Sequence, residues 1–454
     1  MIARAVGLFS GEALRARALR GTALAVGSFG ASNVLRLASN LVLTRLLFPE
    51  AFGLMALVQV VLTGLAMFSD TGVHLSILQN RRGLEPVFLR TVWTVQIGRG
   101  ILLWLATIAL ARPVAAFYGE PILAWMLPVV GLTAVLQGLG STKPARANRN
   151  LVLGRITAIG LSTQVFAIVM MVVLAALMES VWALVLGSMA GTALHTLLSH
   201  VAMPGHADRL GWDREVFGEL FHFGKWIFVA SIAGFLVNNA DRMILGKFLD
   251  VGTLGIYNIG YFLAMVPLTL ARQIESQILM PVFVRTVEDP PAVARRKIRR
   301  ARLLVAGAAI AMSVAAATLG EWAVALLYEP RYALAGPILV LLALSNAVVA
   351  VTGSYSTMML SQGRSRDFTL QVCVLAVVQT TILLGGIAQF GLIGALAAPG
   401  LSILAIYPLM AWLVARRGVW DPALDAGLLA AAVLGAGLAL WVNPDAVATL
   451  LAGD

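Results

Sequence analysis

The segment LTRLLFPEAFGLM at residues 43–55 and the segment LGKFLDVGTLGIY at residues 245–257 are related by a constant shift of 202 residues. The shift pairs Gly53 with Gly255 and keeps two leucines and a basic residue at matching positions. Each segment lies where one apolar stretch ends and the next begins. Six predicted helices separate the two copies, and an even number gives both copies the same direction across a membrane. The repeat therefore predicts two parallel six-helix bundles around a central cavity.

Apolar runs of about 20 residues, long enough to cross a hydrocarbon core of about 30 Å, recur along the whole chain. Hydrophobic residues make up 59% of the 454 residues and charged residues 12%, about half the usual share of charge in a soluble domain. We expect an all-α polytopic membrane protein with 12 to 13 transmembrane helices. The predicted spans are 22–46, 51–78, 88–111, 121–140, 151–177, 181–201, 223–248, 253–281, 303–320, 333–360, 368–390, 392–415 and, as a thirteenth, 424–442.

This division predicts five regions. They are a basic N-terminal interfacial segment (1–20), an N-terminal bundle (21–203), a cytoplasmic linker (204–222), a C-terminal bundle (223–415) and an extra C-terminal helix with a tail (416–454).

Positive charge is distributed unevenly between the connections. Of the 33 Lys and Arg residues, 25 fall before the first span or in every second connection after it, which the positive-inside rule assigns to the cytoplasm. The N-terminus is therefore predicted to be cytoplasmic, and the net charge of +11 reflects topology rather than nucleic-acid binding. The densest run is Arg295, Arg296, Lys297, Arg299 and Arg300. It is expected to contact anionic membrane lipids, and gathering of substrate is the alternative.

Three segments carry a family resemblance: RLLFPEAFGL (45–54), FSDTGVHLSILQN (68–80) and NADRMILGKFLDVGTLGIYN (239–258). They resemble the polysaccharide and oligosaccharide flippases, and most of all the Wzx-type group within the multidrug/oligosaccharidyl-lipid/polysaccharide exporter superfamily. The resemblance extends from the first to about the eighth predicted helix.

The resemblance implies a multi-pass protein of the bacterial inner membrane that works by alternating access. Its substrate would be a polyprenyl-diphosphate-linked oligosaccharide, flipped from the cytoplasmic to the outer leaflet for exopolysaccharide, lipopolysaccharide O-antigen or capsule biosynthesis. Other polysaccharide assembly proteins are possible partners, and no cofactor is implied.

Arginines inside the predicted spans are the strongest candidate site residues. An ionisable group at the bilayer centre costs about 2.5–3.5 kcal/mol on insertion scales, so each one needs a role. Arg36, Arg99 and Arg272 are predicted to line the cavity and bind the diphosphate, because guanidinium groups bind phosphate oxygens through paired donors. The alternative is that each arginine pairs with a nearby carboxylate or carbonyl and holds helices together.

Other polar residues inside the spans have less specific predicted roles. Asp70 and Glu275 are candidates for ion coupling or for balancing an arginine. Asn238, Asn239, Gln273 and Gln277 are candidates for contacts with sugar hydroxyls, although helix–helix hydrogen bonds explain them equally well. The histidines show no metal-binding spacing.

Two other functions remain open at this stage. A glycan polymerase or ligase would be an enzyme of the same pathway, but every predicted loop is short and none contains an acidic sugar-transfer motif, so no enzyme is predicted. A cation-coupled multidrug exporter of the same superfamily is the other alternative. The excess of arginine over carboxylate inside the spans disfavours cationic drugs.

Overall fold

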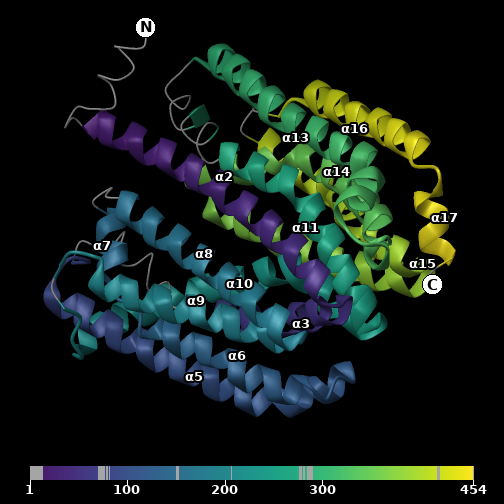
Figure 1. The fold of residues 1–454 in the computed structure, drawn as a ribbon. Helices are drawn as coiled ribbons and strands as arrows, with labels where there is room; N and C mark the ends of the chain where they lie inside the picture. The colour runs from purple at the N-terminus through teal and green to yellow at the C-terminus, as the bar shows by residue number, and fades with distance from the viewer. Residues whose placement is uncertain are drawn as a thin grey trace, which may run out of the picture. The chain divides into compact units, whose positions relative to one another are not determined.

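The computed structural model describes residues 14–69, 77, 80, 82–149, 153–205, 207–275, 279, 282–283, 290–416 and 420–452. Every regular element in this part is a helix (Figure 1). Contacts divide the chain into unit 1, Met1–Ile232, and unit 2, Ala233–Asp454. The all-α fold is confirmed, and the two six-helix bundles stay a prediction.

The two copies of the repeat form the same helix junction. In the first copy α2 (Leu14–Leu46) ends and α3 (Pro49–Phe68) begins, and in the second α10 (Arg214–Phe248) ends and α11 (Val251–Ile274) begins. These ends and beginnings are related by the same 202-residue shift. Pro49 occupies the first turn of α3, where its missing N–H is tolerated. Asp250 caps α11 instead, because its Oδ1 accepts a hydrogen bond of 3.0 Å from the Thr253 N–H.

The helices of unit 1 pack in pairs. After α2 and α3 come α5 (Pro86–Tyr118), α6 (Leu123–Gly138), α7 (Lys143–Arg149), α8 (Leu153–Met178), α9 (Trp182–Val201) and the first part of α10. Helix α5 packs on α6, α8 on α9, and α2 on α8. Helices α8 and α9 approach closely at Gly187. A Cβ atom at this position would lie 2.4 Å from Met171 Cγ, so a larger residue would not fit. Small residues permit such contacts in membranes.

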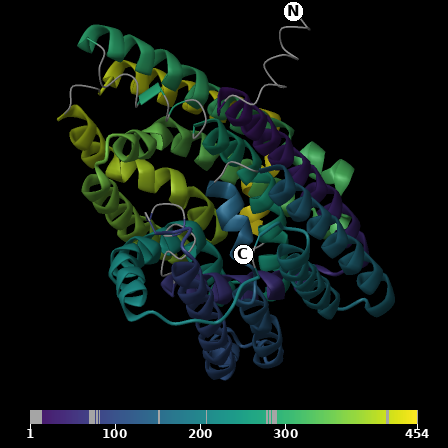
Figure 2. The same cartoon turned by 90° about the vertical axis from the view of Figure 1, so that its left-hand side faces the viewer.

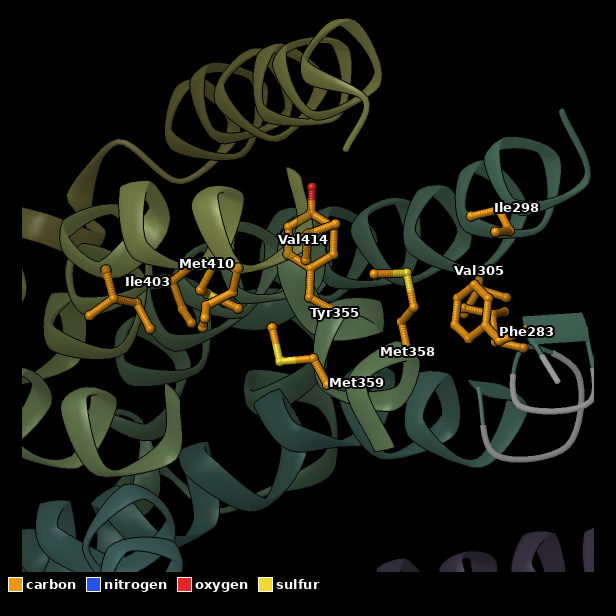
Figure 3. Close-up of a cluster of buried hydrophobic side chains, with 12 residues drawn as sticks. Phe283, Ile298, Val305, Tyr355, Met358, Met359, Ile403, Met410 and Val414 are labelled. Atoms are coloured by element: carbon orange, nitrogen blue, oxygen red, sulfur yellow. The ribbon is translucent and has the colours of Figure 1, made fainter. Parts of the chain in front are cut away.

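Unit 2 is built around α14. After α11 come α13 (Pro291–Leu327), η2 (Pro330–Tyr332), α14 (Ala335–Ser361), α15 (Ser365–Ala415), α16 (Pro422–Val442) and α17 (Asp445–Ala452) (Figure 2). Helix α14 packs against α11, α13, α15, α16 and α17. Tyr355, Met358 and Met359 of α14 are buried in an apolar cluster together with side chains of α13 and α15 (Figure 3). This core holds α14 at the centre of the unit.

Helix α15 consists of two segments that fold back on each other. The backbone leaves helical geometry at Phe390 and Gly391, and Gly391 has a φ of 54°. A Cβ atom at Gly394 would lie 2.2 Å from the Gly386 carbonyl oxygen. In a straight helix these two glycines would be about 12 Å apart along the axis, so the chain reverses between them. The two segments correspond to the predicted spans 368–390 and 392–415.

Length and composition identify nine helices of the described chain that could cross a membrane, or ten if the bent pair α6–α7 forms one span. The 51-residue α15 counts once in this set, although its reversal supplies two segments. Helices α2 and α10, which correspond to the predicted spans 22–46 and 223–248, are not members of this set for the described residues. The thirteenth predicted span is present as α16, and α17 has only 8 residues.

Helices α2, α10 and α13 begin well before their predicted starts, and α2 begins at Leu14 rather than at Thr22. Helix α10 begins at Arg214, inside the segment predicted as a linker, and α13 begins at Pro291 rather than at Leu303. The basic run of residues 295–300 is therefore helical and not a loop. The extension of α13 is rich in Arg, Lys and Ala, which have high helix propensity. At the start of α10, Asp213 Oδ1 accepts hydrogen bonds from the N–H groups of Glu215 and Val216 and so caps the helix.

Candidate functional site

Arg99 of α5 binds the end of a neighbouring helix. Its Nε donates a hydrogen bond of 3.0 Å to Ser69 Oγ, and its Nη2 donates one of 2.6 Å to the Ala66 carbonyl oxygen. Both acceptors lie in or just after the last turn of α3, where carbonyl groups lack helical partners and the helix dipole favours a cation. These contacts favour the helix-locking alternative for Arg99. The sequence did not indicate this role, because the predicted span 51–78 places Ala66 and Ser69 in the middle of a helix, whereas α3 ends at Phe68.

Arg36 lies on an exposed part of α2 beside a polar helix contact. One turn before it, Ser32 Oγ donates to Gln164 Oε1 at 2.7 Å, and Gln164 Nε2 donates back to the Ser32 carbonyl at 3.0 Å. This reciprocal pair fixes the rotation of α2 against α8. Four residues of helix turn through about 400°, so Arg36 lies about 40° from the direction of Ser32 and close to the α2–α8 contact. Sequence reasoning missed Ser32 and Gln164.

Arg272 and Glu275 of α11 are one turn apart but differ in exposure. Arg272 is exposed, whereas Glu275 has a relative exposure of 9%. A Cβ atom at Gly353 of α14 would lie 3.1 Å from Glu275 Oε1, so the carboxylate lies directly against this glycine. Glu275 therefore packs against α14 and also lies near Arg272. The Arg272 side chain is accessible.

Asp241 and Arg242 of α10 each contact a tyrosine of α11. Tyr257 Oη donates a hydrogen bond of 2.6 Å to Asp241 Oδ2, and the Arg242 guanidinium lies 4.0 Å from the centre of the Tyr261 ring. The two tyrosines are one turn apart, so this polar seam follows the α10–α11 hairpin. It holds the two helices together through pairing between elements.

Two of the four residues predicted to contact sugars form hydrogen bonds within their own helix. The amide groups of Asn238 and Asn239 donate to carbonyls one turn earlier in α10, at 2.7 Å and 3.3 Å. Gln273 is half-buried in α11. Asp70 and Gln277 lie outside the described residues, so their predicted roles stay predictions.

Unit 2 contains a buried ionic network that sequence reasoning missed. Arg302 of α13 is 1% exposed and Asp425 of α16 is 3% exposed, and Arg302 Nη2 donates to Asp425 Oδ1 at 2.7 Å. Arg302 Nε also donates to Ser354 Oγ at 2.9 Å, while the hydroxyls of Tyr355 and Tyr407 donate to Asp425 Oδ2. Four segments, α13, α14, the second half of α15 and α16, therefore meet at one carboxylate.

A cavity of about 210 Å³ lies beside this network. Apolar side chains of α14, α15 and α16 form most of its wall, with Tyr407 and Asp425 as polar members. Pockets for drug-sized ligands measure about 300–1,000 Å³, so this cavity is too small for an oligosaccharide.

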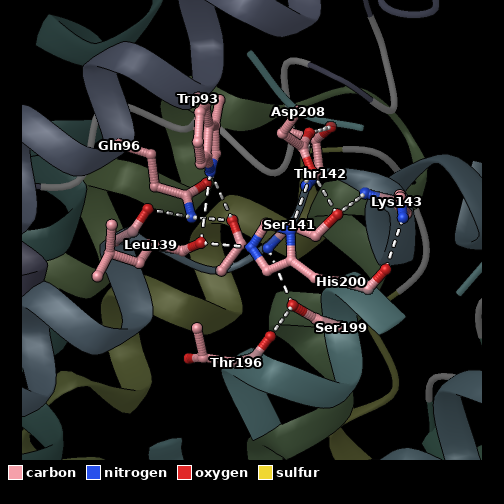
Figure 4. Close-up of polar contacts among 12 residues, drawn as sticks. Trp93, Gln96, Leu139, Ser141, Thr142, Lys143, Thr196, Ser199, His200 and Asp208 are labelled. Carbon is pink, nitrogen blue, oxygen red and sulfur yellow. Dashed lines mark hydrogen bonds and ion pairs between the residues drawn. The ribbon is translucent and has the colours of Figure 1, made fainter. Parts of the chain in front are cut away.

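At one end of unit 1, a polar cluster fastens the segment between α9 and α10 (Figure 4). Asp208 accepts hydrogen bonds of 2.5 Å from the hydroxyls of Ser141 and Thr142, and its Oδ2 lies 3.7 Å from His200 Nδ1. Lys143 Nζ donates to the His200 carbonyl at 2.6 Å. The cluster joins the ends of α6, α7 and α9, which makes it a structural anchor.

Solved transporters share this fold. The structure matches a lipid II flippase, MurJ, in an inward closed conformation with a TM-score of 0.70 and 11% identity, over 92% of this chain and 97% of that chain. It matches a multidrug resistance MATE family transporter of the MOP superfamily, facing inward, with a TM-score of 0.65 and 13% identity, over 85% and 95% of the two chains. At these identities the likeness defines the class by fold: a polytopic protein with the architecture of this superfamily.

Sequence comparison then gives the family. The sequence model of the family described as "Polysaccharide biosynthesis protein" matches residues 42–337, which include both copies of the repeat. The chain belongs to this family, which confirms the resemblance inferred from the motifs.

Two relatives illustrate the family. The lipopolysaccharide biosynthesis protein WzxC of Escherichia coli (strain K12) is 26% identical over 249 residues, 55% of this chain and 50% of the relative. The succinoglycan biosynthesis transport protein ExoT of Rhizobium meliloti (strain 1021) is 24% identical over 335 residues, 72% and 65% of the two chains. The chain thus spans between half and two thirds of these relatives.

Proposed function

We propose that this protein flips a polyprenyl-diphosphate-linked oligosaccharide from the cytoplasmic to the outer leaflet of a bacterial inner membrane. Family membership supports a role in polysaccharide biosynthesis, and one relative is named a transport protein. The fold shared with a lipid flippase supports movement of a lipid rather than enzymatic synthesis. The substrate, the leaflets and the cytoplasmic N-terminus are parts of the proposal.

The observation that carries the proposal is an accessible arginine inside a predicted span of each unit. Arg36 of α2 and Arg272 of α11 both have exposed side chains. Charge at such positions is expensive, so a bound anion is a physical reason to keep it there. A diphosphate offers several oxygen acceptors, and a guanidinium binds them bidentately at any physiological pH. A cationic cavity that opens alternately to the two sides is the mechanism we propose.

A multidrug exporter would have the same fold, so the charge of the substrate distinguishes this alternative from the flippase. Exported cationic drugs would be repelled by accessible arginines, whereas a diphosphate is attracted. Polysaccharide polymerases and other assembly proteins are expected to act on the flipped product.

The test is transfer of a fluorescent polyprenyl-diphosphate oligosaccharide across proteoliposomes that contain the purified protein. We expect wild type to transfer it, and Arg36→Ala and Arg272→Ala to lower the initial rate at least tenfold while thermal unfolding stays near that of wild type. Arg112→Ala is the matched control, because Arg112 is also an exposed arginine of a long apolar helix but lies near its predicted outer end. This control is expected to transfer normally.

Transfer at the wild-type rate by both folded arginine variants would remove the cationic mechanism but keep the transport assignment. Absence of transfer by wild type, combined with export of a cationic dye, would favour the drug-exporter alternative. Equal losses in all three variants would indicate a general effect of net charge.

A further inference from the structure

Helix α13 is much longer than a membrane span. Its 37 residues extend about 55 Å, whereas the hydrocarbon core of a bilayer is about 30 Å thick. One large apolar side chain is exposed near the start of the helix, Val293, and the others are exposed from Leu303, at 51%, to Leu326, at 63%. This interval covers about 35 Å along the axis, so it accounts for the part of the helix inside the hydrocarbon. The first turns of α13 must lie outside it.

Those first turns carry a ring of cations, which we call the basic collar. The collar consists of Arg295, Arg296, Lys297, Arg299 and Arg300, and all five side chains are exposed. Ile298, Arg302 and Val305 are buried and form the stripe that packs against the rest of unit 2. The cations thus cover an arc of about 200° on the helix surface away from this stripe.

The collar lies at the depth of lipid headgroups. Its centre precedes Leu303 by about five residues, which is about 8 Å along the helix. The headgroup layer on each side of a bilayer is about 5–8 Å thick, since a bilayer of about 40–45 Å contains a hydrocarbon core of about 30 Å. Long arginine and lysine side chains can reach the phosphate plane from this height.

Helix α16 fixes the collar in this position. Arg299 Nε lies 3.4 Å from Asp421 Oδ2, and one turn deeper Arg302 is paired with the buried Asp425. The two aspartates are one turn apart on α16, and α13 and α16 lie side by side (Figure 1). The paired helices hold the backbone of α13 rigid where it leaves the hydrocarbon, so the collar is preorganised and its binding requires little ordering.

We infer that the basic collar of α13 is a binding site for the headgroups of anionic phospholipids, held in place by α16. Phosphate groups bind arginine through charge-assisted, bidentate hydrogen bonds, and clusters of four to eight cations beside a transmembrane helix attract anionic lipid. Zwitterionic headgroups carry no net negative charge, so the collar discriminates between lipid classes. The site is independent of the flipped substrate and of the arginines inside the spans.

The test is lipid binding to the full-length protein by native mass spectrometry, with phosphatidylglycerol and phosphatidylcholine of identical acyl chains in competition. Replacing all five collar residues by Gln is expected to lower the preference for phosphatidylglycerol at least tenfold. The matched control replaces five other exposed arginines of the predicted cytoplasmic side by Gln, namely Arg90, Arg155, Arg209, Arg214 and Arg366. It removes the same charge and is expected to change the preference less than threefold.

A second variant guards against misfolding of the first. R295Q/R296Q/R300Q leaves the Arg299–Asp421 pair intact and is expected to lower the preference about threefold. With wild type, raising NaCl from about 50 to 500 mM is expected to weaken the preference, because exposed charges are screened. The inference is overturned if the folded collar variants keep the wild-type preference, if the control loses as much, or if salt has no effect.

Discussion

The two units satisfy arginine in apolar surroundings with different partners. In unit 1, Arg99 donates to a backbone carbonyl and a serine hydroxyl at the end of α3. In unit 2, Arg302 donates to the carboxylate of Asp425. Arg302 also donates to a serine hydroxyl, and two tyrosine hydroxyls donate to the same carboxylate. The first arrangement uses the partial charge of a helix end, and the second uses a full opposite charge.

This difference determines how much stability each unit loses when one partner is removed. Removing Arg99 leaves the Ala66 carbonyl and the Ser69 hydroxyl, at the end of α3, without this donor. Removing the charge of Asp425 leaves a guanidinium buried without its counterion, which is far more costly. The contact in unit 2 also joins four helical segments, whereas that in unit 1 joins two. Unit 2 is therefore expected to depend more strongly on a single residue.

The largest expected effect comes from Asp425→Asn. The exchange keeps the shape of the side chain but leaves Arg302 buried and uncompensated, so we expect a loss of about 3–5 kcal/mol in the free energy of unfolding. Asp421→Asn is the control on the same helix, since Asn still caps α16 and the Arg299–Asp421 pair is partly exposed. That change is expected to cost about 0–1 kcal/mol. Thermal unfolding in detergent measures both.

Similar effects of the two changes would contradict the contrast drawn between the buried and the exposed pair. Arg302→Met combined with Asp425→Leu provides a further check. It replaces both charges by apolar side chains, and we expect it to recover most of the stability lost in Asp425→Asn.

A smaller effect is expected for Arg99→Met. The change removes two charge-assisted hydrogen bonds to the end of α3, so we expect a loss of about 1.5–3 kcal/mol in stability. Transport by the folded fraction is expected to remain within threefold of wild type. Arg36→Ala is expected to show the reverse pattern, with near-normal stability and little transport. If Arg99→Met is stable but does not transport, the diphosphate-binding role of Arg99 is supported and its helix-locking role is wrong.

The sequence predicted the helices well where the bilayer determines them. The break between the spans 368–390 and 392–415 and the shifted junction at Pro49 and Val251 were visible because apolar runs and turn residues mark them. The early starts of α10 and α13 were not visible. Outside the hydrocarbon a helix needs no apolar run, and a run of cations fits a loop as well as a helix.

The sequence selects candidate arginines but does not show their partners. An arginine within an apolar run stands out, which is how Arg36, Arg99 and Arg272 were selected. Partners are set by tertiary packing: Arg302 and Asp425 are 123 residues apart in sequence, and Ser32 and Gln164 are 132 apart. Arg302 follows directly on the basic collar, so the sequence grouped it with exposed cations although it is 1% exposed.

The smallest expected effect tests how firmly unit 2 holds its other buried carboxylate. In Gly353→Ala the new methyl group would lie 3.1 Å from Glu275 Oε1, so the carboxylate must shift by a few tenths of an ångström. We expect a net loss of about 1 kcal/mol in stability from this overpacking. Gly307→Ala in α13 is the control, because nothing lies within 4 Å of its new Cβ, and it is expected to stabilise the helix by about 0.5–1 kcal/mol. If Gly353→Ala stabilises the protein as much as Gly307→Ala does, Glu275 is loosely held and its packing role is wrong.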